Sequence, residues 1–197
     1  HILANMPGVD DLRMIAGGEQ AVTVVAFHED LLDQIDRRTV AYVYVDGKFG
    51  LTPPGTQLVT VYAEIPGFDS PVPLMYGIVQ GKATNIYRVL FERLHSLGFL
   101  PRRMHADFET AIHNAAQCVF PHMQVIGCHF HFMQAIRKNY IDLYGNRVAD
   151  KEILEQHIEP FMREMAYART EAEFQITYRQ FHTWAQRARR MDFFDYF

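Results

Sequence analysis

The sequence predicts an α/β fold with a mixed sheet, in which three antiparallel strands precede parallel strands with crossover helices, followed by a C-terminal all-helical extension. Three observations lead to this prediction. Short apolar runs separated by turn residues come first, apolar residues at helical spacing then alternate with shorter runs, and helical spacing alone remains after His131. With 197 residues, 49% hydrophobic and 21% charged, the chain can form one packed domain with an appendage.

The three antiparallel strands are predicted over residues 40–45, 57–65 and 72–79. The links between them contain Pro53-Pro54-Gly55 and the segment 66–71, which begins and ends with proline. Proline and glycine at these spacings are typical of turns. Links this short favour antiparallel hairpins, because a parallel connection needs a longer crossover.

The pattern then changes to helices alternating with short strands. A helix is predicted over 84–97, where Gly98 closes it, and a second helix over 110–119. Strands over 104–106 and 124–128 follow these helices and are therefore expected to be parallel. The remaining predicted elements are an irregular lead-in over 1–20, a strand over 21–27, a helix over 29–38, and C-terminal helices over 132–144, 151–168 and 171–189.

This order of elements is that of the RNase H-like fold, in which the first and fourth strands of the core lie side by side. Asp46 follows the first of these strands and Asp107 follows the fourth, so the two side chains are expected to meet. The predicted domain ranges are a lead-in over 1–38, an RNase H-like core over 39–145 and a helical insertion over 146–197.

Composition excludes several classes of protein. The net charge of −4 and the pI of about 6.2 argue against a compact basic DNA-binding module, so strong DNA contacts are expected outside this chain. No apolar run approaches the roughly 20 residues of a membrane span, and no secretory signal is recognised. Two cysteines are too few for a disulfide scaffold and indicate a reducing compartment.

Asp46 and Asp107 are the candidate catalytic residues. Two carboxylates at neighbouring strand ends suit Mg²⁺ or Mn²⁺, and two such ions can activate and stabilise oxygens during phosphodiester cleavage. Each residue also has a simpler interpretation: Asp46-Gly47 is a common turn pair, and Asp107 could cap the following helix. Glu109 could support the site or be a first-turn helix charge.

A third candidate motif is Cys128-x-x-His131, at the end of the last predicted strand. Cysteine and histidine can bind zinc, but two ligands do not complete a structural zinc site. A buried thiol with a hydrogen-bonded imidazole is an equally good interpretation.

An ordered set of short motifs resembles the transposase domain of Mutator-like elements (MULEs) over about residues 29–144. No single motif is specific, whereas their order and spacing are. The set comprises Asp46-Gly47-Lys48-Phe49, Val72-Pro73-Leu74, Lys82 before Tyr87, Asp107-Phe108-Glu109, Asn114-Ala115-Ala116, Phe120-Pro121, and Gly127-Cys128-His129-Phe130-His131 with Gln134 and Arg137.

The resemblance implies a DDE-type transposase core that cleaves DNA and joins it to a target with Mg²⁺ or Mn²⁺. Asp46 and Asp107 match the first and second catalytic aspartates, and Cys128 and His131 match the family's Cys-x-x-His signature. The third carboxylate, a glutamate, is expected beyond residue 197, so the chain alone is expected to be weakly active or inactive. The expected partners are element-end and target DNA and further copies in the full-length protein, in the nucleus, with neither membrane nor small-molecule cofactor.

Two alternatives remain open. The first is a domesticated or decayed transposase-derived module, a nuclear DNA-associated or protein-binding scaffold without catalysis, because the third carboxylate is missing and the charge is acidic. The second, a 3′–5′ exonuclease, is disfavoured because Lys48 stands where those enzymes carry a second carboxylate.

Two predictions concern the C-terminal helices. Phe174, Phe181 and Trp184 recur at helical spacing and are expected in their core. The aromatic tail over 193–197 is expected to be covered by sequence or a partner outside this chain.

Overall fold

The computed structural model describes residues 9–10, 24–27 and 29–196, and most of the predicted lead-in lies outside them. The chain divides into two compact units, which we call the sheet unit (residues 1–128) and the helical unit (residues 129–197). This division follows Cys128, whereas the sequence placed a domain boundary after residue 145. The assignment of ranges 1–38, 39–145 and 146–197 to a lead-in, a catalytic core and an insertion stays a prediction.

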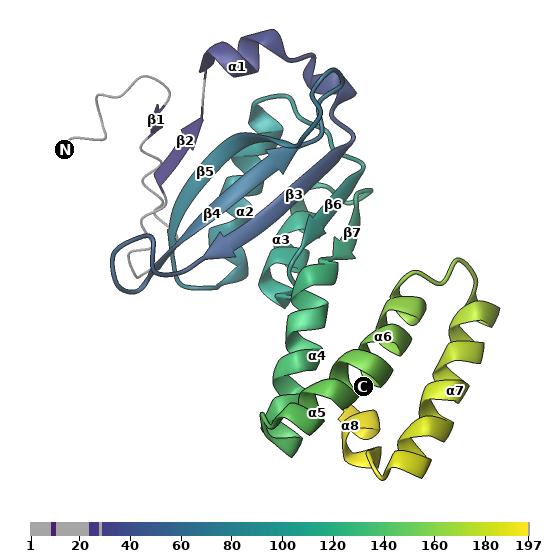
Figure 1. The fold of residues 1–197 in the computed structure, drawn as a ribbon. Helices are drawn as coiled ribbons and strands as arrows, with labels where there is room; N and C mark the ends of the chain where they lie inside the picture. Colours follow the sequence, from purple (N-terminus) through teal and green to yellow (C-terminus); the bar gives the residue numbers. More distant parts are fainter. Residues whose placement is uncertain (1–8, 11–23, 28, 197) are drawn as a thin grey trace. The chain divides into compact units, whose positions relative to one another are not determined.

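The described part of the sheet unit contains one mixed sheet of seven strands in the order β1-β2-β5-β4-β3-β6-β7 (Figure 1). The predicted hairpins are confirmed, because β3, β4 and β5 pair antiparallel. The predicted parallel strands are also confirmed, because β6 pairs parallel with β3 and with β7. The strands are β1 (Val9–Asp10), β2 (Val24–Phe27), β3 (Tyr42–Lys48), β4 (Thr56–Ala63), β5 (Val72–Gln80), β6 (Arg103–Ala106) and β7 (Gln124–Gly127).

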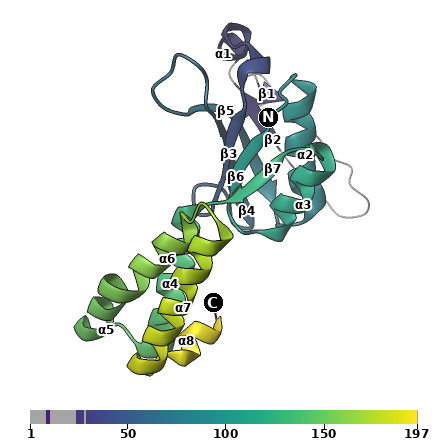
Figure 2. The same ribbon diagram turned by 90° about the vertical axis from the view of Figure 1, so that its right-hand side faces the viewer.

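Two crossover helices, α2 (Thr84–Ser96) and α3 (Thr110–Val119), lie on the same side of the sheet (Figure 2). As predicted, α2 ends before Gly98, whose φ of 87° belongs to the left-handed region that glycine adopts without strain. A short helix α1 (Glu29–Gln34) and a 3₁₀ turn (Arg37–Thr39) precede β3. The arrangement is consistent with an RNase H-like fold.

The core of the sheet unit lies between the strands and these two helices. Strand side chains alternate between the two faces of a sheet, and on β3 Val43 and Val45 are buried whereas Tyr42 and Tyr44 are half-buried. The buried face of β3 is therefore the one covered by α2 and α3, which contribute buried side chains such as Leu90 and Ile112.

Strand β3 extends beyond the predicted end at residue 45. Its last residues pair with β4, Asp46 with Thr60, Gly47 with Val59 and Lys48 with Leu58. Ladder hydrogen bonds to β4 hold these residues extended although they are exposed and polar. The interpretation of Asp46-Gly47 as a turn is therefore wrong.

The helical unit has a separate core of aromatic and aliphatic side chains. Its helices begin at His129, earlier than predicted, and the predicted helix over 151–168 contains a π-helical segment, Leu154–Ile158. None of the helices in the described ranges is both long and apolar enough to cross a membrane. The helices are α4 (His129–Tyr144), α5 (Val148–Ile153), α6 (Glu159–Ala166), α7 (Glu171–Ala188) and α8 (Met191–Tyr196).

The prediction that outside sequence or a partner covers the aromatic tail is wrong for Phe193 and Phe194. Both are buried in the core of the helical unit. Phe193 meets Tyr140 edge to face, with ring centroids 5.5 Å apart, and Phe194 lies 5.2 Å from Tyr178. The predicted core position of Phe181 is confirmed. Phe197 lies outside the described residues.

Candidate metal site

The backbone register places Asp46 and Asp107 side by side. Strands β3 and β6 pair in parallel, and their last pair is Val45 with Ala106. Asp46 and Asp107 are the next residues on the two strands, and neighbouring strands lie about 4.8 Å apart. The predicted adjacency of the two strands is confirmed. The role of the two carboxylates as metal ligands stays a prediction.

The alternation of side chains assigns Asp46 to the face of the sheet opposite α2 and α3. It follows Tyr44 by two residues and therefore shares its face, on which the ring of His105 stacks against Tyr44 with ring centroids 5.0 Å apart. The hydrogen bond to Glu64, together with partial burial, raises the pKa of Tyr44 to about 12. Asp46 itself is exposed and Asp107 half-buried, so solvent reaches the pair.

Local hydrogen bonds fix the turn that carries Asp107. The backbone N–H of Phe108 donates to Oδ1 of Asp107 at 2.6 Å, and Nε2 of His113 lies 2.8 Å from the Asp107 carbonyl oxygen. Because a carbonyl oxygen can only accept, this contact requires the tautomer with a proton on Nε2. The first helical turn of α3 thereby holds the backbone of Asp107.

Asp107 is not the N-cap of α3. That position belongs to Glu109, whose side chain makes no capping hydrogen bond. The carboxylate of Glu109 instead accepts from the hydroxyl of Tyr87 at 2.8 Å and from Nζ of Lys82 at 3.0 Å. Glu109 therefore belongs to a side-chain network beside the aspartates, and the interpretation as a helix charge alone is incomplete.

Sequence reasoning missed two members of this network, Gln57 and Tyr87. Gln57 is 2% exposed, and its amide donates to the hydroxyl of Tyr87 and, at 3.5 Å, to the carbonyl oxygen of Gly81. Burial and the hydrogen bond to Glu109 raise the pKa of Tyr87 far above its ordinary value. A glutamine at the start of the alternating set Val59, Val61 and Ala63 is the sequence feature that could have indicated a buried polar contact.

Cys128 follows β7, the strand beside β6. Its backbone N–H donates to the carbonyl oxygen of Ala106 at 2.7 Å, which extends the parallel ladder by one residue. The thiol is half-buried. His131 lies in the first turn of α4, in the helical unit. A joint zinc site of Cys128 and His131 stays a prediction.

The donor set at Asp46 and Asp107 fits a hard divalent cation. Mg²⁺ is usually bound through one or two carboxylates and keeps several waters, and both side chains supply oxygen ligands at accessible positions. Within the described ranges, no group of three or more His, Cys, Asp or Glu residues could hold a metal ion. A pair of carboxylates suits an ion that also takes oxygens from water or substrate.

One comparison with known proteins bears on this site. Residues 42–135 match the family model of the MULE transposase domain, which confirms the resemblance seen in the sequence motifs. The matched range includes Asp46, Asp107 and the Cys128-x-x-His131 motif. A search among curated proteins gave no match.

Proposed function

We propose that this chain, which carries a MULE transposase domain over residues 42–135, is the RNase H-like core of an enzyme that cleaves DNA strands and transfers them to a target. The observation that supports this most is the pairing of Val45 with Ala106, which sets Asp46 beside Asp107 within the matched range. A transposase acts on phosphodiesters. Paired carboxylates at the solvent-accessible C-terminal ends of two neighbouring strands suit that chemistry.

In this proposal Asp46 and Asp107 hold Mg²⁺ or Mn²⁺. When bound, such ions activate the attacking oxygen and stabilise the leaving oxygen of a phosphodiester. The chain's own contribution is to hold its ligands in place: β4 fixes the backbone of Asp46, and the N–H of Phe108 orients the carboxylate of Asp107. Pre-organised ligands need little rearrangement when substrate arrives.

The proposed substrate is DNA, at element ends and at the target, and the proposed compartment is the nucleus. The exposed Lys48, two residues after Asp46, is suitably placed for a phosphate contact. We propose that the assembled enzyme is an oligomer. Zinc at Cys128 and His131 is a secondary proposal, based on the chemistry of the two side chains.

The test is metal-dependent cleavage of element-end DNA by the polypeptide encoded by the whole reading frame. Asp46→Asn and Asp107→Asn should each lower the cleavage rate at least about 100-fold, because a metal contributes several kcal/mol to the transition state. The matched control is Asp69→Asn, an exposed aspartate in the β4–β5 turn, which should leave the rate unchanged.

Cleavage that survives both substitutions would refute the catalytic assignment. DNA binding without metal-dependent cleavage, equal in the unchanged protein and in both variants, would instead support the scaffold alternative.

A further inference from the structure

We infer that Gln57, Tyr87 and Glu109 form a positioning network that holds Asp46 and Asp107 at the spacing a metal ion requires. The inference rests on the proposed function. Its starting observation is that the β3–β6 ladder stops at Val45 and Ala106, one residue before the two aspartates. Backbone pairing between these strands therefore brings the two aspartates to neighbouring positions, but it does not by itself fix the distance between their carboxylates.

The first contact of the network lies directly after Asp46. A Cβ atom on Gly47 would come within 3.0 Å of the Gln57 side-chain oxygen, so this amide packs closely on the Gly47 backbone. Gln57 lies in β4 and is almost fully buried. A glycine at this position leaves room for the Gln57 side chain, whose amide also bonds to Tyr87 of α2.

Tyr87 of α2 makes the second contact. Its hydroxyl accepts a hydrogen bond from the amide of Gln57 and donates one to Oε1 of Glu109 at 2.8 Å. A tyrosine hydroxyl has one proton to donate, so this arrangement uses it fully. The ring of Tyr87 is 1% exposed, which leaves the hydroxyl little freedom to move.

Glu109, two residues after Asp107, completes the network. Its second oxygen, Oε2, accepts from Nζ of Lys82 at 3.0 Å, and this ammonium group lies 5.1 Å from the ring centroid of Phe49. Both oxygens of Glu109 are thus engaged, and its side chain is only 18% exposed. The network therefore runs from Gly47, next to Asp46, to the turn that carries Asp107.

The network acts through the backbone rather than on substrate. Gly47 directly follows Asp46 in β3, and consecutive residues of a strand face opposite sides of the sheet. Gly47 therefore faces α2 and α3, whereas Asp46 faces the other side. Metal sites lose affinity when supporting residues no longer hold the ligands within about 0.5 Å of their proper places. Gln57, Tyr87 and Glu109 are thus positioning residues for the two aspartates.

The test measures Mn²⁺ binding to the 197-residue chain by electron paramagnetic resonance, with unfolding curves for every variant. Tyr87→Phe and Glu109→Ala should weaken Mn²⁺ binding about tenfold. Glu109→Gln keeps an acceptor for Tyr87 and should lose less affinity than Glu109→Ala. The matched control is Tyr44→Phe, because Tyr44 also donates to a glutamate, Glu64, and lies even closer to Asp46 in sequence.

The outcomes distinguish a failure of the positioning role from a failure of the proposed function. Tyr87→Phe and Tyr44→Phe each remove a hydroxyl that donates to a glutamate, so a purely structural role of Tyr87 predicts small changes in Mn²⁺ affinity in both variants. That result, with binding still lost in Asp46→Asn, would overturn the positioning role and leave the proposed function intact. If the unchanged chain binds no Mn²⁺, the positioning role is overturned, and DNA cleavage by the polypeptide of the whole reading frame still decides the proposed function. If Asp46→Asn binds Mn²⁺ equally well, the metal-ligand role of Asp46 and the positioning role both fail.

Discussion

Two glycines of the sheet unit lie so close to a neighbouring side chain that a Cβ atom would force that side chain to move. A Cβ atom on Gly77 of β5 would lie 2.5 Å from Cδ2 of Leu90, a buried residue of α2. A Cβ atom on Gly127 of β7 would lie 2.2 Å from the ring of Phe108, which is 56% exposed. The two sites thus differ in whether the neighbouring side chain can move away.

Gly77→Ala should lower the free energy of unfolding by about 1–3 kcal/mol, because overpacking displaces a buried side chain. The gain of about 0.5–1 kcal/mol from replacing glycine inside a strand is smaller than this loss. Gly127→Ala is the matched control and should change stability less, since Phe108 can turn into solvent. Urea unfolding measures both, and equal losses would contradict this account of the packing.

At this scale the sequence correctly predicted that the strands leading to Asp46 and Asp107 are neighbours, but it missed the contact of Gln57 with Tyr87. The aspartates could be found because each follows a recognisable strand, and neighbouring strands bring their ends together. The contact of Gln57 with Tyr87 depends on how α2 packs across β4, which no local pattern encodes. The sequence treated Tyr87 only as part of a motif, and its hydrogen bonds became visible in three dimensions.

At the scale of elements, the periodicity of apolar residues predicted the helices and strands well where those residues are the ones that pack in the core. Helix α3 has the predicted bounds, and β5 and β6 differ from prediction by one residue. Strand β3 ran longer than predicted because pairing with β4 continues past its apolar residues. The π-helical segment Leu154–Ile158 was also missed, because such segments are rare and occur as single turns inside α-helices.

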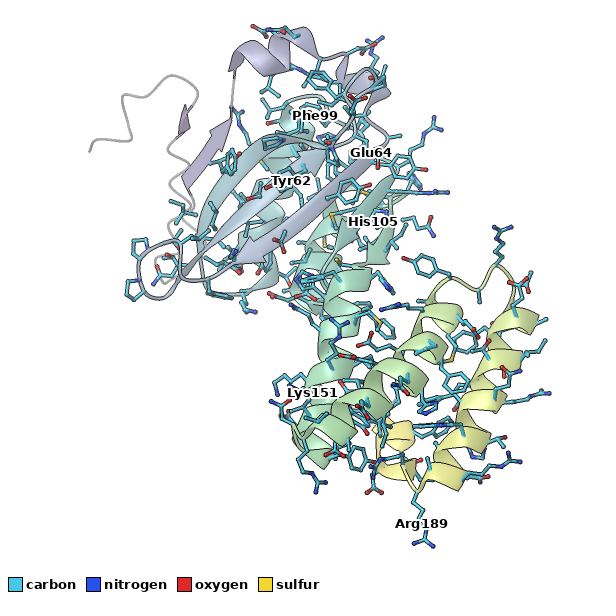
Figure 3. The ribbon with its side chains drawn as sticks, viewed as in Figure 1. Tyr62, Glu64, Phe99, His105, Lys151 and Arg189 are labelled. Atoms are coloured by element: carbon cyan, nitrogen blue, oxygen red, sulfur yellow. The ribbon has the colours of Figure 1, made fainter. Side chains whose placement is uncertain are left out.

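The aromatic tail over 193–197 was wrongly predicted to need a cover from outside the chain, because the turn before it was not recognised. Helix α7 ends at Arg189, which adopts a left-handed conformation with φ of 56° and lies at the turn into α8 (Figure 3). The chain reverses there, and α8 brings Phe193 and Phe194 into the core. A left-handed arginine is uncommon, and no glycine marked the turn in the sequence.

The described residues form two separate hydrophobic cores, one in each unit. The single tryptophan, Trp184, belongs to the helical unit, where its ring stacks on Phe181 at a centroid distance of 6.1 Å and lies tilted to Phe161 at 6.2 Å. Its fluorescence therefore reports on the unfolding of the helical unit alone.

Phe181→Ala should lower the fluorescence-detected midpoint of urea unfolding, because truncating a buried phenylalanine costs about 3–5 kcal/mol. Leu90→Ala, which truncates an equally buried side chain in the sheet unit, should leave this midpoint unchanged. A similar shift in both variants would show that the two units unfold as one.

The central claim is that Asp46 and Asp107 together hold a divalent metal ion. The most direct measurement is anomalous diffraction from crystals of the chain soaked in Mn²⁺. We expect one anomalous peak about 2.1 Å from a carboxylate oxygen of Asp46 and of Asp107. Crystals that bind Mn²⁺ at other positions, with no peak between these two carboxylates, would contradict the claim.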